Sequence, residues 1–281
     1  MVYISDDTLD RLMKEDVPYI DLTTLALDIG GERGRMSFHC REEAVVCGSE
    51  EAERILHKLN VKTLYRMTSG TRVDPNTIVL EAEGYSADLH RAWKVCQNLF
   101  EYYSGVASST ARLVTRAREF NPDIQVVSTR KVIPGTKELA IKAVIAGGGW
   151  PHRLGLSETI LVFEQHTIFT GGLDGFLGMV DRMKKSNPEK KIIAEAKSAE
   201  EGLRLAAAGV DGVQFDKVDA DLLTDAVKEI RSISPAVTIL AAGGIKEDNV
   251  GPFAHTGVDA IVTSAMYYGR PADFGVKILK I

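Results

Sequence analysis

The stretch STRKVIPGTKELAIKAVIAGGGWPHRLGLSETILVFEQH, residues 128–166, decides both the fold and the site that the sequence predicts. The apolar run 125–129 ends in Arg130 and Lys131, and Pro134-Gly135 then breaks the extended pattern before a helical one begins. Two basic residues therefore follow the carboxyl end of a predicted buried strand. Unpaired cations are rare inside a sheet, and ligands gather at the carboxyl ends of parallel strands. Arg130 and Lys131 are therefore candidates for an anion site.

Strands and helices alternate on both sides of this stretch, from Ser108 onward. The segments that predict strands are 125–130, 159–164, 191–197, 212–217, 238–242 and 259–264. Residues 198–208 and 221–232 are rich in Ala or apolar at helical spacing, and both predict helices. This alternation is typical of a parallel α/β sheet that closes, or nearly closes, into a barrel.

The first hundred residues have a different rhythm, which predicts a separate, strand-rich domain. Residues 5–15 predict a helix capped by Ser5, residues 50–59 a second helix, and a long helical stripe of apolar residues begins at Ala87. Two segments, 35–39 and 44–47, predict strands that pair with each other. Further strands are predicted at 62–67 and 77–82.

The composition limits the partners of the protein. With a formal charge of -5 and a pI near 5.8, the chain as a whole is unsuited to binding nucleic acid or a membrane surface. Local basic clusters in an acidic chain suggest small anionic ligands instead. The three cysteines lack metal-type spacing, no apolar run reaches membrane-spanning length, and the N-terminus is too acidic for a secretory signal. We therefore expect a cytoplasmic protein with reduced thiols.

Several short motifs, in order along the chain, resemble those of the quinolinate phosphoribosyltransferase family, also called nicotinate-nucleotide pyrophosphorylase (carboxylating). The family's TRKTxPG, yAV, GGG and NHR motifs correspond to Thr129-Arg130-Lys131 with Pro134-Gly135, Ala143-Val144, Gly147-Gly148-Gly149 and His152-Arg153. Glu15-Asp16 and Asp21-Leu22-Thr23-Thr24 resemble the family's weaker ED and DxT motifs. The runs WPHRLGLSET and LVFEQH are similar to the branch named ModD, which is associated with molybdenum transport.

The resemblance implies a fold, a reaction and an assembly. The fold would be an N-terminal α/β sandwich domain over 1–105, to which 270–281 return as a strand, followed by an incomplete TIM-like α/β barrel over 106–269. The reaction would be attack of a ring nitrogen of a small aromatic base on phosphoribosyl pyrophosphate, with Mg²⁺, releasing diphosphate. The assembly would be a homodimer or larger homo-oligomer whose sites are shared between subunits.

The resemblance also implies roles for individual residues. Lys131 would bind the leaving diphosphate, while Glu195 and Asp216 would hold Mg²⁺ and the ribose hydroxyls. The substrate-binding residues would be Lys94, Thr129, Arg130, Lys137, His152, Arg153, Phe163 and His166. The phosphate-binding residues would be Ala242, Gly243, Gly244, Ser264 and Ala265. The histidine at 166 could bond to the ligand or only to the backbone.

Some residues depart from the family's motifs. Phe163 stands where the IKxNH motif has Lys, and Lys94 stands where the family has Arg. Both changes weaken the grip on carboxylates. The base could therefore be quinolinate, in which case decarboxylation to a nicotinate nucleotide would follow, or a different heteroaromatic base stacked on Phe163. Ala242 and Ser264 replace Ser and Gly in the phosphate loops. A helical Lys such as Lys94 is also commonly just a solvated surface charge.

Other interpretations of these residues stay open from the sequence. Glu195 and Asp216 could instead form ion pairs with the neighbouring Lys197 and Lys217. His152 could be a buried structural histidine.

Two other functions are also compatible with parts of the sequence. A non-catalytic binding or regulatory protein of molybdenum metabolism could use the same scaffold, although it would not need the metal-binding and leaving-group residues. Another barrel enzyme, such as a sugar-phosphate isomerase, would account for the phosphate loop but not for the ordered motifs.

Overall fold

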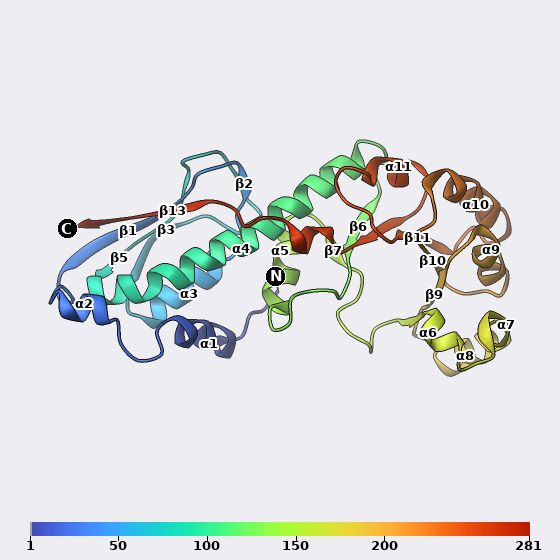
Figure 1. Cartoon of the computed structure of the whole chain (residues 1–281), viewed down its shortest axis with the longest axis horizontal. Helices are drawn as coiled ribbons and strands as arrows, with labels where there is room; N and C mark the ends of the chain where they lie inside the picture. Colours follow the sequence, from blue (N-terminus) through green and yellow to red (C-terminus); the bar gives the residue numbers. More distant parts are fainter. Residues whose placement is uncertain (1) are drawn as a thin grey trace. The chain divides into compact units, whose positions relative to one another are not determined.

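The chain folds into two compact units in a computed structural model that describes residues 2–281 (Figure 1). The first unit comprises residues 2–111, 132–148 and 266–281, and the second comprises 112–131 and 149–265. Our predicted domain boundary, between residues 105 and 106, stays a prediction; by contacts, the segment 132–148 belongs to the first compact unit. The reason is close packing: a Cβ on Gly147 would lie 2.3 Å from the Ala107 carbonyl oxygen.

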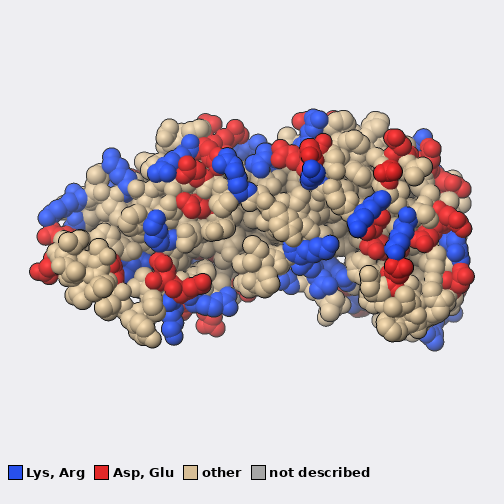
Figure 2. Space-filling view, viewed as in Figure 1, with Lys and Arg blue, Asp and Glu red and all other residues tan. Residues whose placement is uncertain are grey.

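The surface carries charges of both signs. On the face shown in Figure 2, Lys and Arg side chains lie among Asp and Glu side chains. Within residues 2–281, no helix is both long enough and apolar enough to cross a membrane.

The main sheet of the first unit has four antiparallel strands in the order β13-β1-β5-β3. These are β1 (Arg33–Cys40), β3 (Lys62–Arg66), β5 (Ile78–Tyr85) and β13 (Phe274–Lys280). A separate pair joins β2 (Ala44–Val45) to β4 (Arg72–Val73). The predicted pairing of 35–39 with 44–47 is therefore wrong. Both edges of β1 are occupied by β5 and β13, which are distant from it in sequence. The nearest predicted strand along the chain is therefore not its partner.

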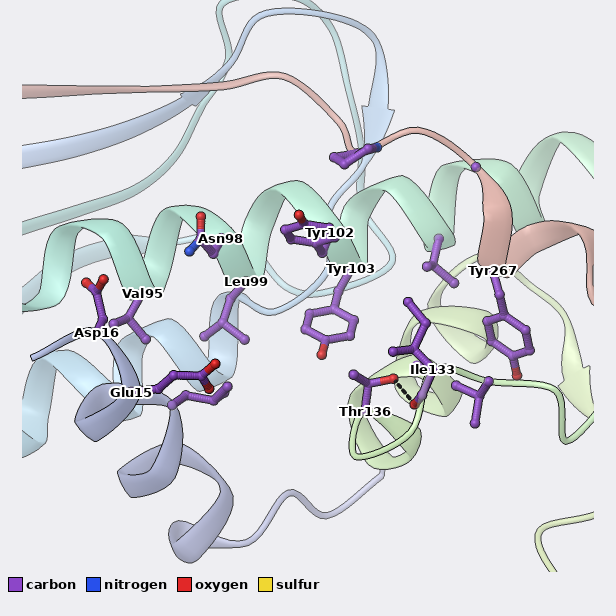
Figure 3. A pocket seen from close by; sticks show the side chains of 16 residues that line it. Glu15, Asp16, Val95, Asn98, Leu99, Tyr102, Tyr103, Ile133, Thr136 and Tyr267 are labelled. Atoms are coloured by element: carbon purple, nitrogen blue, oxygen red, sulfur yellow. Dashed lines mark hydrogen bonds between the residues drawn. The ribbon is translucent and has the colours of Figure 1, made fainter. Parts of the chain in front are cut away.

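The helices of the first unit are α1 (Asp6–Asp16), α2 (Leu22–Ala26), α3 (Ser49–Lys58), α4 (Ser86–Arg118, whose end belongs to the second unit) and α5 (Lys137–Ala146). Ser5 caps α1 as predicted, because its hydroxyl accepts a hydrogen bond from the Thr8 amide at 3.2 Å. A cavity of about 580 Å³ lies between α1, α4 and the loop before α5 (Figure 3). Glu15, Asp16 and several tyrosines line it, but no Lys, Arg or His does.

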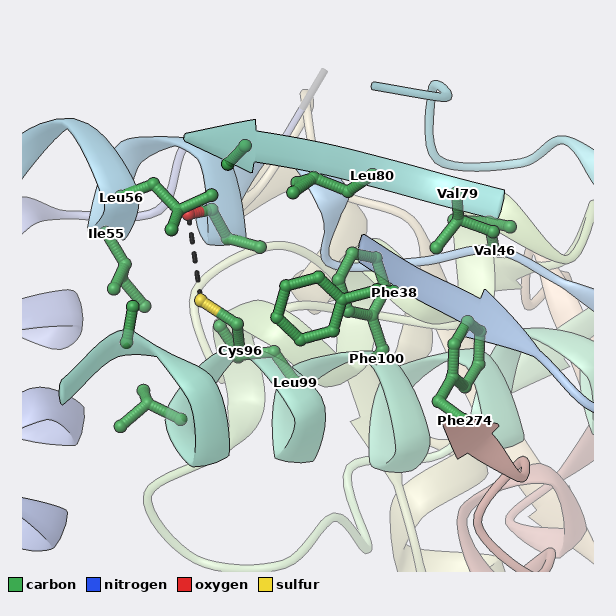
Figure 4. Close-up of a cluster of buried hydrophobic side chains, with 14 of the residues drawn as sticks. Phe38, Val46, Ile55, Leu56, Val79, Leu80, Cys96, Leu99, Phe100 and Phe274 are labelled. Atoms are coloured by element: carbon green, nitrogen blue, oxygen red, sulfur yellow. Dashed lines mark hydrogen bonds between the residues drawn. The ribbon is translucent and has the colours of Figure 1, made fainter. Parts of the chain in front are cut away.

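The core of the first unit lies between the sheet and the helices α3 and α4 (Figure 4). Three phenylalanines from distant parts of the chain meet there: the Phe100 ring centroid is 5.3 Å from those of both Phe38 and Phe274. Offset aromatic contacts of this kind add to the apolar area buried. The last strand is therefore part of the same core as the first.

The sheet of the second unit has seven parallel strands in the order β7-β6-β12-β11-β10-β9-β8. These are β6 (Gln125–Ser128), β7 (Trp150–Pro151), β8 (Ile160–Val162), β9 (Ile192–Ala196), β10 (Gly212–Asp216), β11 (Thr238–Ala242) and β12 (Ala260–Thr263). All six predicted strands are present. The seventh strand, β7, was not predicted because it has only two residues. As β7 and β8 are the edges of this sheet, the predicted open α/β barrel is confirmed.

The helices of the second unit are α6 (Glu164–Thr167), α7 (Gly172–Leu177), α8 (Val180–Ser186), α9 (Ala199–Ala207), α10 (Ala220–Ile233) and α11 (Val250–His255). The predicted helices at 198–208 and 221–232 correspond to α9 and α10. Buried side chains from β6, β8, β9, β11 and β12 form one apolar cluster, against which the ring of Phe163 packs. This apolar interior leaves the strand ends as the place for polar chemistry.

Candidate functional site

The predicted site residues of the second unit gather at one edge of its sheet. All seven strands are parallel, so their carboxyl ends meet at the same edge. This edge carries Thr129, Arg130 and Lys131 after β6, His152 and Arg153 after β7, Phe163 and His166 after β8, Glu195 in β9, Asp216 in β10, Ala242, Gly243 and Gly244 at the end of β11, and Ser264 and Ala265 after β12. Lys94 and Lys137, by contrast, belong to the first unit.

Two arginines at this edge form no ion pair with any described residue. Arg153 is buried and Arg130 is exposed, and neither has a hydrogen bond or ion pair from its side chain within residues 2–281. Burial, together with the nearby charge of Arg130, lowers the pKa of Arg153, although the more distant charge of Glu158 partly opposes the fall. Two adjacent cations without a partner favour an anionic ligand, and guanidinium groups grip carboxylates with paired hydrogen bonds.

The ring of Phe163 lies beside these cations. The guanidinium carbon of Arg153 is 6.0 Å from the Phe163 ring centroid, and the His166 ring stacks on Phe163 with centroids 5.8 Å apart. His166 Nδ1 accepts a hydrogen bond from the Phe163 amide at 3.0 Å, so this histidine does bond to the backbone. An aromatic face next to an arginine suits a planar acidic ligand.

His152 has a ring nitrogen that no described group satisfies. Its Nε2 is buried without a hydrogen-bond partner in the part of the chain that the structure describes. Burial, and then the charge of Arg153, lower the pKa of His152, which favours the neutral ring. A satisfied structural histidine would have a partner at this nitrogen, so the geometry favours the ligand-binding interpretation.

Two carboxylates lie on neighbouring strands, β9 and β10. Burial, and then the charge of Asp216, raise the pKa of Glu195, while a 3.3 Å hydrogen bond from Gln214 partly opposes the rise. The alternative ion pairs are not formed: Lys197 pairs with Glu164, and Lys217 has no ion pair within residues 2–281. Carboxylates that repel each other favour a bound cation.

The turn after β11 requires glycine. Gly243 has a φ of +92°, and a Cβ there would lie 2.7 Å from Asp216 Oδ1 and 2.5 Å from the Cγ of Lys217. Gly244 has a φ of +75° and open space around it. The backbone of this turn is therefore accessible to an anion.

Hydrogen bonds hold the ends of β6 and β12 together. The hydroxyls of Thr129 and Ser264 are 2.6 Å apart, and the Lys131 amide donates to Thr129 Oγ1 at 3.1 Å. The side chain that replaces glycine at 264 therefore fastens the segment that carries Arg130 and Lys131.

Lys94 interacts with its own helix in the first unit. Its Nζ donates to Gln97 Oε1 at 3.1 Å and lies 4.9 Å from the centroid of the Trp93 ring. Lys137 begins α5 and is exposed. Neither observation tests the predicted binding roles, which stay predictions.

A smaller cavity of about 170 Å³ reaches the sheet edge of the second unit. It is lined by Phe163, the carboxylates of Glu164, Glu195 and Glu201, the ammonium of Lys197, and Thr167, together with apolar residues. The larger cavity of the first unit offers carboxylates but no cation, so it is a poor match for an anionic substrate. We therefore place the candidate site at the sheet edge.

Comparison with protein families accounts for this arrangement. Residues 106–277 match the model described as "Quinolinate phosphoribosyl transferase, C-terminal domain", and residues 21–104 match the N-terminal domain of the same family. The chain belongs to the quinolinate phosphoribosyl transferase family. The predicted family and the predicted enzyme class, a phosphoribosyltransferase, are confirmed.

Relatives extend over the whole chain. A "Putative pyrophosphorylase ModD" of Pasteurella multocida is 36% identical over 280 residues, covering 100% of this chain and 99% of that protein. A protein of the same name from Rhodobacter capsulatus is 38% identical and covers 92% of this chain and 98% of its own length. The nicotinate-nucleotide pyrophosphorylase structure from Francisella tularensis has a TM-score of 0.88 and 25% identity, covering 99% of this chain and 98% of that one.

Proposed function

We propose that this enzyme transfers the phosphoribosyl group of phosphoribosyl pyrophosphate to a ring nitrogen of an acidic heteroaromatic base. The ring nitrogen would form a bond to the anomeric carbon, while the bond from that carbon to diphosphate breaks and its electron pair leaves with diphosphate. This reaction needs positioned anions and stabilisation of developing charge rather than a protein nucleophile.

One observation carries the proposal. A single sheet edge presents arginines after β6 and β7 that form no ion pair with any described residue, two mutually repelling carboxylates on β9 and β10, and an open glycine turn after β11. The arginines suit the acidic groups of a base, and the glycine turn suits a phosphate. Lys131 would meet the leaving diphosphate.

Glu195 and Asp216 fit a magnesium ion. Their mutual repulsion, which contributes to the raised pKa of Glu195, would be relieved by a divalent cation. No group of three or more His, Cys, Asp or Glu side chains suited to a metal occurs within residues 2–281. Two acids are nevertheless enough for Mg²⁺, which commonly completes its ligand set with water and substrate phosphates. When bound, the ion would neutralise charge on the departing diphosphate.

The base is proposed to differ from quinolinate. Phe163 packs on the apolar interior of the barrel where the family motif has a lysine, so one cation is missing beside Arg153. An acidic ring with fewer or differently placed carboxylates would leave no charge unpaired and could stack on Phe163.

A homodimer or larger assembly is also proposed. In the first unit, Tyr19, Ile20, Leu22, Leu25 and Leu27 are 62 to 91% exposed, a run of large apolar side chains that is unusual on a protein surface. Burial against a second copy would remove this area from water. The predicted link to molybdenum and the cytoplasmic location remain predictions.

Calorimetry with Mg²⁺ tests the proposal. Phosphoribosyl pyrophosphate, quinolinate and nicotinate are titrated into the wild type, Phe163→Lys and the control Phe169→Lys, which changes an exposed ring in the same region. We expect the wild type to bind phosphoribosyl pyrophosphate and only Phe163→Lys to bind quinolinate. Quinolinate binding by the wild type would contradict the change of base.

The transfer itself is measured as diphosphate released on adding acidic heteroaromatic bases. Absence of phosphoribosyl pyrophosphate binding, or of diphosphate release with every such base, would overturn the proposed function.

A further inference from the structure

Lys217 adopts a backbone conformation that lysine disfavours. It follows Asp216 at the end of β10 and has a φ of +59°. The other non-glycine residues with positive φ within residues 2–281 are Asp28, Asn60 and Asn76, whose short polar side chains tolerate this region. Lysine has no such local compensation.

The neighbouring strand holds Lys217 in this conformation. Its amide donates to the Ala242 carbonyl oxygen at 2.9 Å. Its Cγ lies 2.5 Å, and its amide nitrogen 2.6 Å, from the position that a Cβ on Gly243 would take. The aliphatic part of the Lys217 side chain therefore packs against the backbone of Gly243. This contact restricts the direction in which the side chain can point.

The ammonium group at the end of this side chain has no partner among the described residues. Lys217 is exposed and makes no side-chain hydrogen bond or ion pair within the described chain. Two other lysines that follow strands of the same sheet are paired: Lys197 with Glu164, and Lys246 with Asp248 at 2.7 Å. A strained backbone that orients an unpaired cation points to a functional role.

We propose that Lys217 binds a phosphoryl group of phosphoribosyl pyrophosphate beside the Gly243-Gly244 turn. This inference rests on the proposed function, because it needs that substrate at this sheet edge. A lysine ammonium is a compact point charge well suited to phosphoryl oxygens. The glycine turn and the lysine would then act together, the turn through its backbone and Lys217 through its charge.

The test uses Lys217→Asn, because asparagine accepts a positive φ while removing the charge. The matched control is Lys246→Asn, which removes a paired lysine that follows the adjacent strand. Calorimetry with Mg²⁺ compares phosphoribosyl pyrophosphate, ribose 5-phosphate and inorganic pyrophosphate as probes. We expect Lys217→Asn to weaken phosphoribosyl pyrophosphate roughly 10- to 100-fold at unchanged melting temperature, Lys217→Arg to retain most of the affinity, and the control to bind like the wild type.

The probes separate the two phosphates. A loss confined to ribose 5-phosphate supports contact with the 5-phosphate, and a loss confined to pyrophosphate supports contact with the diphosphate. Equal affinity of Lys217→Asn and the wild type for all three probes would overturn the inference while leaving the proposed function intact. If the wild type itself binds none of them, the proposed function fails, and this inference fails with it.

Discussion

The two units treat charged side chains in opposite ways. In the first unit, the ammonium of Lys142 on α5 lies 2.8 Å from Glu50 Oε2 and 2.5 Å from Glu51 Oε2, and its side chain is 7% exposed. Arg66 and Ser69 donate further hydrogen bonds to Glu50. Every charge in this cluster has a partner. At the sheet edge of the second unit, by contrast, Arg153 is buried and forms no ion pair within residues 2–281.

The contrast separates charges that are paired within the fold from charges that we propose bind a ligand. Burying an ion costs several kcal/mol of desolvation unless an oppositely charged partner offsets it. In the Lys142 cluster, the ion pairs within the protein offset this cost and join α5 to α3. We propose that a substrate and a metal ion stabilise the cations and carboxylates at the sheet edge, so the comparison predicts different consequences of mutation in the two places.

The largest expected effect is on stability, from Lys142→Met. This change leaves Glu50 and Glu51 without their shared cation in a buried place, and we expect a loss of about 3 to 5 kcal/mol in the free energy of unfolding. Chemical denaturation measures it. The control is Lys94→Met, an exposed lysine of the same unit that should cost less than about 1 kcal/mol. A loss below about 1 kcal/mol in the free energy of unfolding of Lys142→Met would contradict a stabilising role for this charge cluster.

A smaller effect, on binding rather than stability, is expected for Arg153→Met. Removing a buried cation that lacks a partner should leave the melting temperature unchanged or raise it. Affinity for the acidic base should fall by about 2 to 3 kcal/mol, since a charge-assisted contact is lost. Calorimetry and thermal melts measure the two effects. The control is Arg204→Met, which removes an exposed ion pair with Asp174. A marked loss of stability in Arg153→Met would show that Arg153 has a structural role instead.

A third expected effect is a contrast in pH dependence between Glu50 and Glu195. Although burial opposes ionisation, hydrogen bonds from Lys142 and Ser69 lower the pKa of Glu50 to about 2 from its ordinary 4.5. Stability from Glu50 is therefore present above pH 4.5 and lost as the pH falls towards 2. Burial, and then Asp216, raise the pKa of Glu195, so its ionised form costs stability above that pKa, and the cost disappears as the pH falls to 4.5.

Unfolding measured from pH 7 to pH 3 checks this contrast. Glu195→Gln should stabilise the protein at pH 7, with the difference shrinking towards pH 4.5. Glu50→Gln should destabilise it at pH 7, with the difference shrinking only below pH 4.5. Parallel pH profiles for the two variants would remove the distinction between the clusters.

Local patterns predicted much of this molecule correctly. The apolar segments of the second unit predicted six of its strands, because parallel strands covered on both faces are nearly continuous hydrophobic runs. The Ser5 cap and the helices α9 and α10 were also predictable, since their signals lie within a few neighbouring residues. The positions of most site residues at strand ends followed from the same periodicity.

Other features depend on residues that are far apart in sequence. Strand β1 pairs with β13, more than two hundred residues later, and Phe38, Phe100 and Phe274 meet in one core. No local pattern predicts such partners, because pairing and packing depend on which apolar surfaces come together. The segment 132–148 joins the first unit for the same reason.

The sequence alone determined the family, six strands of the second unit and the types of side chain at the strand ends, because each of these follows from local periodicity or from short motifs. Only the tertiary structure decided which charges are paired. Lys142, Arg153 and Lys217 are all basic residues, yet the first pairs with two carboxylates and the others form no ion pair in the part of the chain that the structure describes. The energy of a charge depends on its solvation and its neighbours in space, which the folded chain brings together.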